Sequence, residues 1–163
     1  MPKTHAYDVS VRWTGNRGTG TSGYRDYGRE HEVAGSGPTI PGSSDPAFRG
    51  DPARWNPEEL LVASLAQCHL LWFLHVASDA GVIVTGYVDT PTGTLTMDDP
   101  AQPGGEAGSG RFTGVTLRPV VTVADDSMAE RVAGLHKRAA ELCFIARSVG
   151  FPVAHEPSVL VQT

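Results

Sequence analysis

The chain has 163 residues, of which 40% are hydrophobic, and this length is sufficient for one domain with its own core. Its formal net charge of −5 is unlike the basic balance of a general nucleic-acid binder, so that class is disfavoured. Two cysteines exclude a disulfide framework, and the N-terminal ten residues contain no apolar run typical of a secretory signal. We therefore expect a single domain over residues 1–163, located in the cytoplasm, with no nucleic-acid partner.

The first third of the chain predicts one hairpin and then an irregular segment. Apolar and polar residues alternate over residues 7–13, which is the period of a half-buried strand. The glycine-rich residues 15–23 favour a hairpin turn. Residues 31–55 are rich in proline, glycine and polar side chains, a composition typical of an irregular surface loop.

A long apolar helix is predicted next. Residues 56–59, Asn-Pro-Glu-Glu, combine a good N-cap, a proline suited to the first helical position and acidic groups near the positive end of the helix dipole. The helix should run to about Asp79, with Gly81 ending it. Nineteen positions from residue 60 to residue 78 carry no Asp, Glu, Lys or Arg, which is also long enough to cross a bilayer. Polar residues near the middle and the lack of an aromatic or basic belt favour a helix buried within protein.

The rest of the chain predicts strands around a second helix. Strands are expected over residues 82–88, 93–97, 111–123 and 153–161, with a turn at Pro91 between the first two. The second helix should begin at Asp126, carry a capping box from Ser127 to Glu130, and end at Gly150. This order of elements indicates an α+β domain.

Cys68 and Cys143 are the candidates for chemistry, and both are expected on apolar helix faces. Most free cysteines are small buried hydrophobes, and apolar burial favours the neutral thiol. A nearby guanidinium would instead favour the thiolate, and several arginines precede Cys68. The residues alone leave both interpretations open.

Aromatic and histidine side chains surround Cys68 on the same predicted helix. Trp72 and His75 share its helical face, so Trp72 is expected either to pack in the core or to line an apolar pocket. Together with His69 and His136, Cys68 and His75 would form an irregular ligand set, so we expect no metal site.

Three of these segments together resemble the OsmC/Ohr family of bacterial thiol peroxidases. They are NPEELLVASLAQC at residues 56–68, LHKRAAELCFIARS at residues 135–148 and VAHEPSVLV at residues 153–161. The resemblance covers most of the chain. It implies an OsmC-like fold in which antiparallel sheets wrap around a long buried central helix, in an intertwined homodimer.

The resemblance also implies the roles of individual residues. Cys68 matches the peroxidatic cysteine, Cys143 the resolving cysteine and Glu58 the carboxylate of the site. Arg49 lies just before the helix, like the arginine of the OsmC branch, whereas Arg25 resembles the arginine of the Ohr branch; we prefer Arg49.

The sequence departs from the family pattern at two positions. His69 follows the first cysteine where an aromatic residue is common, and Phe144 follows the second where proline is usual.

The implied activity is reduction of organic hydroperoxides. A Cys68 sulfenic acid would condense with Cys143 to a disulfide, which an external dithiol (a lipoyl group or a small thiol) would reduce, with no further cofactor and no membrane. On a straight helix Glu58 and Cys68 are about 15 Å apart, so we expect the site to be shared across a dimer. The alternative is a non-catalytic relative that binds a small apolar ligand in the dimer pocket.

Overall fold

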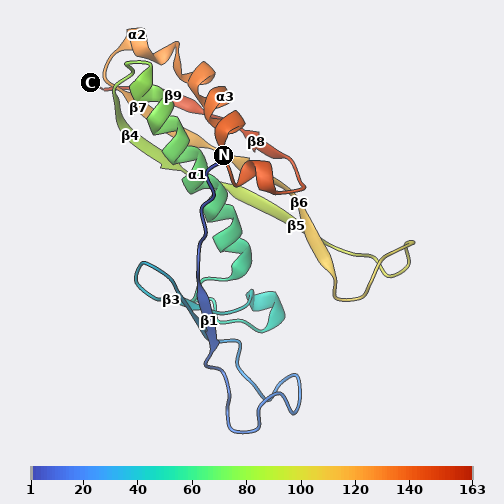
Figure 1. The fold of residues 1–163 in the computed structure, drawn as a ribbon. Helices are drawn as coiled ribbons and strands as arrows, with labels where there is room; N and C mark the ends of the chain where they lie inside the picture. The colour runs from blue at the N-terminus through green and yellow to red at the C-terminus, as the bar shows by residue number, and fades with distance from the viewer. Residues whose placement is uncertain (1, 163) are drawn as a thin grey trace. The chain divides into compact units, whose positions relative to one another are not determined.

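The computed structural model describes residues 2–162, and it contains two compact units, the first up to Leu60 and the second from Leu61. Each unit has its own sheets (Figure 1). Helix α1 (Pro57–Asp79) begins in the first unit and continues into the second.

The first unit is a three-stranded antiparallel sheet with a short 3-10 helix. Strands β1 (Ser10–Trp13), β2 (His31–Ala34) and β3 (Ile40–Gly42) are paired in that order, and η1 (Pro46–Phe48) follows. The predicted hairpin is present, because Trp13 pairs with His31, but its connection spans residues 14–30 rather than 15–23. The expected half-buried strand over residues 7–13 is shorter, and all four residues of β1 are exposed. The prediction of an irregular segment over residues 31–55 is wrong for β2, β3 and η1, since pairing with neighbouring strands overrides a weak local preference.

Both predicted ends of α1 are confirmed by their capping hydrogen bonds. The Glu59 N–H donates to Asn56 Oδ1 at 2.8 Å, and the Asn56 N–H donates to a Glu59 carboxylate oxygen at 3.3 Å. At the other end Gly81 adopts a φ of 69°. The Val82 N–H reaches back to the Ala77 carbonyl at 2.9 Å, the six-residue bond typical of a glycine-terminated helix.

The second unit contains two mixed three-stranded sheets. In the first, β7 (Pro119–Val123) lies between β4 (Val84–Asp89), which is antiparallel to it, and β9 (Ser158–Val161), which is parallel. In the second, β6 (Gly110–Leu117) lies between antiparallel β5 (Thr92–Met97) and parallel β8 (Val153–His155). The α+β class is confirmed, with mixed rather than purely antiparallel sheets.

Two predicted strands are each divided between these sheets. The strand expected at residues 111–123 breaks at Arg118. The Arg118 N–H donates to Asp89 Oδ1 at 2.7 Å instead of to a backbone carbonyl of a neighbouring strand. Pro119, which has no N–H, begins the next strand. The strand expected at residues 153–161 likewise breaks before Ser158, after Pro157. The two breaks let one chain segment contribute to both sheets.

The second predicted helix is wrong as a single element. It consists of α2 (Asp126–Ala129), α3 (Val132–Leu142) and the 3-10 helix η2 (Ala146–Ser148). The capping box expected between Ser127 and Glu130 is wrong too, because Asp125 is the N-cap of α2 and Glu130 ends it. Local capping signals predicted the start of the helix to within a residue but not its division.

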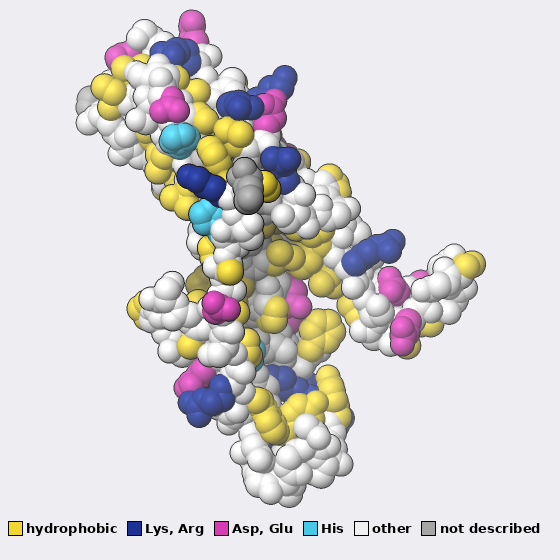
Figure 2. Space-filling view, in the orientation of Figure 1, with side chains coloured by type: hydrophobic (Ala, Val, Ile, Leu, Met, Phe, Trp, Pro, Cys, Tyr) yellow, Lys and Arg dark blue, Asp and Glu magenta, His cyan; other side chains and the backbone are white. Residues whose placement is uncertain are grey.

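Helix α1 is buried along one face only. Its buried residues follow a helical spacing and are Leu65, His69, Phe73, Val76 and Ala77. The four apolar ones join core clusters with residues of β6, β7 and α3. On the other side Leu71 and Leu74 are 66% and 39% exposed, and Figure 2 shows hydrophobic side chains at the visible surface. The expectation of a helix enclosed on nearly every side is therefore not met by one chain alone.

By length and composition α1 is apolar enough to cross a membrane, the one such helix within residues 2–162. Its buried face contacts α3 and both sheets of the second unit, and 22% of its most apolar 18-residue window is buried within the described chain.

Candidate active site

The structure brings the two cysteines of the second unit together. Cys68 is half-buried on α1, and Cys143 is buried directly after α3; both thiols are free. Burial, and then a hydrogen bond with the Cys68 side chain, raises the pKa of Cys143 to about 11. At neutral pH the Cys143 thiol is therefore protonated, and Cys68 is the more accessible sulfur.

Cys143 lies at the end of a helix rather than inside one, which corrects the sequence-based expectation. Its backbone is extended, with φ −64° and ψ 111°. The Ala146 N–H donates to its sulfur at 3.4 Å. The extended residue ends α3 and turns the chain back towards η2.

An apolar cavity of about 340 Å³ opens beside Cys68. Leu71, Trp72 and His75 line it from the same face of α1, and Phe144 lines it from the segment after α3. The Trp72 and Phe144 rings meet edge to face, with centroids 5.3 Å apart. The pocket expected at Trp72 is thus present, and Trp72 also packs against the core.

Phe144 is the pocket residue that sequence reasoning missed. The sequence marks it only as a departure from the expected proline, and no periodicity predicts that a residue after α3 lies against the Cys68 face of α1. Its position depends on the extended backbone of Cys143.

His75 lies at the cavity wall and is paired with a carboxylate. Its Nε2 is 3.5 Å from Asp79 Oδ2, one helical turn along α1. The Trp72 ring meets it edge to face with centroids 5.5 Å apart. The lining therefore combines apolar and aromatic surface with one imidazole.

Arg49, in the first unit, has a strained backbone. Its φ of 66° makes it the one non-glycine residue with positive φ in residues 2–162. Its N–H donates to the Pro46 carbonyl at 3.0 Å, which closes the turn of η1. Non-glycine residues in this region cost of order 1–3 kcal/mol and cluster at functional sites. The turn fixes the backbone at this exposed arginine.

Within the same unit, Glu58 does not meet either predicted arginine. One Glu58 carboxylate oxygen is buried without a hydrogen-bond partner. Neither Arg25 nor Arg49 forms an ion pair among the residues that the structure describes. A cation that completes this carboxylate is thus not supplied by the unit itself.

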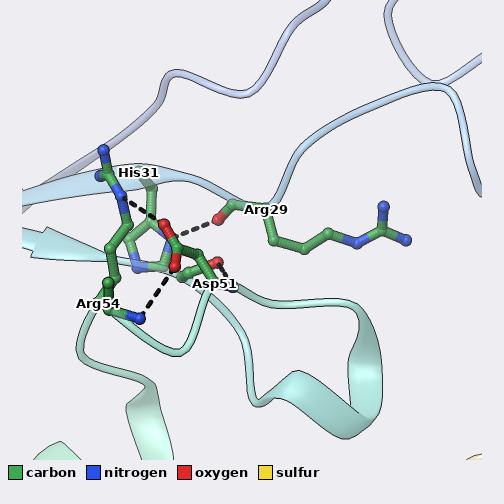
Figure 3. A network of polar contacts seen from close by, with 6 residues as sticks. Arg29, His31, Asp51 and Arg54 are labelled. Atoms are coloured by element: carbon green, nitrogen blue, oxygen red, sulfur yellow. Dashed lines mark hydrogen bonds and ion pairs between the residues drawn. The ribbon is translucent and has the colours of Figure 1, made fainter.

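Two other arginines of this unit are engaged in structural contacts. Arg29 lies over the rings of Tyr24 and Tyr27, at 4.4 and 4.1 Å, and donates to both of their carbonyls. Figure 3 shows its side chain pointing away from His31 and Asp51. Arg54 Nε is 3.7 Å from a carboxylate oxygen of Asp51. Arg29 thereby holds the ends of the loop on which Arg25 is exposed.

Three histidines from different elements form a buried cluster in the second unit. His69 Nε2 and His136 Nδ1 are 2.9 Å apart, and the ring of His155 lies with its centroid 4.4 Å from that of His69. Burial, and then the neighbouring histidines, lowers the pKa of His69 to about 3; the pKa of His136 is lowered to about 4. No group of histidine, cysteine, aspartate or glutamate within residues 2–162 has metal-binding geometry. No pattern in the sequence predicts that His155 joins this cluster.

Comparison with known proteins identifies the family of this chain. The model of the family described as OsmC-like protein matches residues 50–158. An OsmC-like protein of unknown function from Vibrio cholerae is 28% identical, with a TM-score of 0.80 over 94% of this chain and 99% of that one.

Two organic hydroperoxide resistance proteins share the fold. The one from Legionella pneumophila is 18% identical, with a TM-score of 0.65 over 97% of this chain and 98% of that one. A second such protein from Vibrio cholerae, described as putative in that role and solved with captopril in one active site, is 21% identical, with a TM-score of 0.60 over 96% and 93%. No curated protein matches the chain significantly. From the family match over most of its length, the chain belongs to the OsmC-like family.

Proposed function

We propose that this protein is a cysteine-dependent peroxidase that reduces organic hydroperoxides to alcohols. The observation that supports this most directly is the pairing of a half-buried Cys68 at an apolar cavity with a buried, protonated Cys143 beside it. The cavity walls favour a substrate with an apolar group, because burying that group contributes about 25 cal/mol per Å².

The reaction has two steps at sulfur. The Cys68 thiolate attacks the terminal oxygen of the hydroperoxide, so that an S–O bond forms, the O–O bond breaks and the alkoxide leaves to take up a proton. The Cys143 sulfur then attacks the sulfenic sulfur; the S–O bond breaks, the disulfide forms and water leaves. An external dithiol, lipoyl or small, reduces the disulfide. We propose the cytoplasm as the compartment, because thiols are kept reduced there.

A guanidinium completes the site in this proposal. Arg49 is the preferred residue, because a strained turn presents it, and Arg25 is the alternative. The positive charge favours the thiolate, and its N–H groups bind the peroxide oxygens. The buried, unpartnered carboxylate oxygen of Glu58 would accept from the same guanidinium.

We propose that a second copy of the chain supplies part of this site. Glu58 and Cys68 are separated by ten residues of continuous helix, about 15 Å, so one guanidinium cannot contact both on the same helix. The exposed face of α1 at Leu71 and Leu74 is the apolar surface such a partner would cover. A homodimer explains both features.

Mass spectrometry after one equivalent of cumene hydroperoxide tests the reaction. The wild type should lose the mass of two hydrogen atoms, and Cys143→Ser should gain one oxygen atom on Cys68. Cys68→Ser should keep its mass, which also serves as the control for non-specific oxidation. An unchanged wild-type mass would overturn the proposal and favour the ligand-binding alternative, for which the apolar cavity is equally suited.

A further inference from the structure

The hydrogen bond between His69 and His136 joins the two elements that carry the cysteines. His69 directly follows Cys68 on α1, and His136 lies on α3 seven residues before Cys143. Both rings are buried, with 0% and 2% exposure. Of the hydrogen bonds within residues 2–162, this is the one that connects α1 with α3. It is thus one residue away from the first thiol and two helical turns away from the second.

Apolar packing alone does not fix how far α3 is shifted along α1. Phe73 of α1 and Ala139 of α3 belong to one hydrophobic cluster, but burial of apolar surface has no preferred direction. A hydrogen bond between two buried rings is directional, and breaking it leaves desolvated nitrogens without partners. The pair therefore adds one directional contact to the apolar packing between α1 and α3.

Within the described residues, the His69 and His136 rings form no hydrogen bond other than the one that joins them. His69 Nδ1 and His136 Nε2 have no hydrogen-bond partner among the residues described. Phe73 stacks on the His136 ring with centroids 4.1 Å apart, and His155 lies against His69. Tyr87 Oη, Asp89 Oδ2 and His155 Nε2 are also buried without a hydrogen-bond partner, and the Tyr87 ring lies with its centroid 6.4 Å from that of His136.

We propose that His69 and His136 are positioning residues, whose hydrogen bond holds α3 in the register at which the Cys143 thiol meets Cys68. This inference rests on the proposed function in one respect: it treats the Cys68–Cys143 disulfide as an intermediate of the peroxidase reaction. A disulfide requires Cα atoms about 4.4–6.8 Å apart. A shift of α3 along α1 by half a helical turn, about 2.7 Å, is comparable to the whole width of this range.

Substitutions at His136 separate the hydrogen bond from the packing of the ring. His136→Phe keeps an aromatic ring against Phe73 but removes the bond. His136→Asn places an amide atom where Nδ1 lies, so it keeps the bond but loses most of the ring. His69→Phe breaks the bond from the other helix and serves if the first variant does not fold. His5→Asn, at an exposed position, is the matched control.

The disulfide equilibrium with dithiothreitol, without any peroxide, gives the effective concentration of the two thiols. His136→Phe and His69→Phe should lower it roughly tenfold, which raises the two-electron reduction potential by about 30 mV. His136→Asn and His5→Asn should remain near the wild type, although His136→Asn unfolds at lower urea than the wild type. An unchanged value in the phenylalanine variants would overturn the proposal. The proposal would also be overturned if the effective concentrations ranked the variants in the same order as their stability in urea, because that result would indicate a purely structural role.

A second measurement keeps this inference apart from the peroxidase proposal. With cumene hydroperoxide and dimedone, His136→Phe should form Cys68 sulfenic acid at the wild-type rate and close the disulfide roughly tenfold more slowly. If wild-type Cys68 does not react with the hydroperoxide, the peroxidase proposal fails, and the dithiothreitol result still decides whether the histidines position the thiols.

Discussion

The two cysteine residues differ in ways that match the order of their proposed reactions. Cys68 is half-buried at an open cavity, where a hydroperoxide can reach it. Cys143 is buried, and its raised pKa keeps it protonated and unreactive towards a peroxide in solution. Attack on a neighbouring sulfenic acid is intramolecular and tolerates a small thiolate fraction, because the effective concentration is high.

Phe144 lines the cavity, and 63% of its surface remains exposed. Phe144→Ala should lower kcat/KM for cumene hydroperoxide roughly tenfold and leave that for hydrogen peroxide unchanged, because the lost contact is with the apolar group alone. Steady-state assays with both oxidants measure the difference. Val88→Ala, another exposed apolar truncation, should alter neither value. An equal fall with both oxidants would show that the ring does not select the substrate.

At the scale of elements, two glycines in helical segments have opposite backbone requirements. Gly81 ends α1 with a φ of 69°, whereas Gly134 lies within α3. An added Cβ would meet no atom within 4 Å at either position. Steric crowding therefore does not distinguish the two sites, and the backbone conformation does.

Alanine at these two positions should change the free energy of unfolding in opposite directions. Gly81→Ala should lower it by about 1–2 kcal/mol, because the left-handed conformation is costly for an L-residue. Gly134→Ala should raise it by about 0.5–1 kcal/mol through helix propensity. Urea denaturation of both variants at one protein concentration measures this. The same sign at both positions would contradict the assigned helix end.

At the scale of the whole molecule, the buried histidine cluster predicts loss of stability in acid. Above about pH 6.5 the histidines are neutral in both folded and unfolded chains, so they add no pH dependence. Below it the unfolded chain takes up protons that His69 and His136, with lowered pKa values of about 3 and about 4, do not. The free energy of unfolding should therefore fall by about 1.4 kcal/mol per pH unit for each such histidine.

Urea titrations between pH 7.5 and pH 4.5 measure this loss. His136→Asn should reduce the slope, and His5→Asn should retain it. A wild-type slope that is unchanged by His136→Asn would assign the acid sensitivity to other groups.

The exposed face of α1 makes a further prediction at this scale, on the state of association. Sedimentation equilibrium should give twice the mass of one chain. Leu71→Glu should yield a single chain, because a carboxylate cannot be buried unpaired in an apolar interface. Lys137→Glu, a change at an exposed position of α3, should leave the association unaltered. A wild-type protein with the mass of one chain would remove the basis for a shared site.

Local features of the sequence predicted the elements whose determinants are local. The Asn56 cap and Gly81 bound α1 to within a residue, because capping involves only neighbouring backbone groups. Strand periodicity over residues 7–13 located β1 only in part, because the strand begins at Ser10 and is exposed on both faces. The division of residues 111–123 at Arg118 was not predictable, since it depends on Asp89 from another strand.

The sequence by itself determined the α+β class, the long apolar helix and the two cysteines, because periodicity, caps and residue chemistry are properties of short segments. Only the tertiary structure decided that Cys143 ends a helix, that Phe144 lines a cavity at Cys68, and that His69, His136 and His155 share one buried cluster. These features join residues distant in the chain. Their contacts arise from the packing of α1 against α3 and the sheets, which no local pattern encodes.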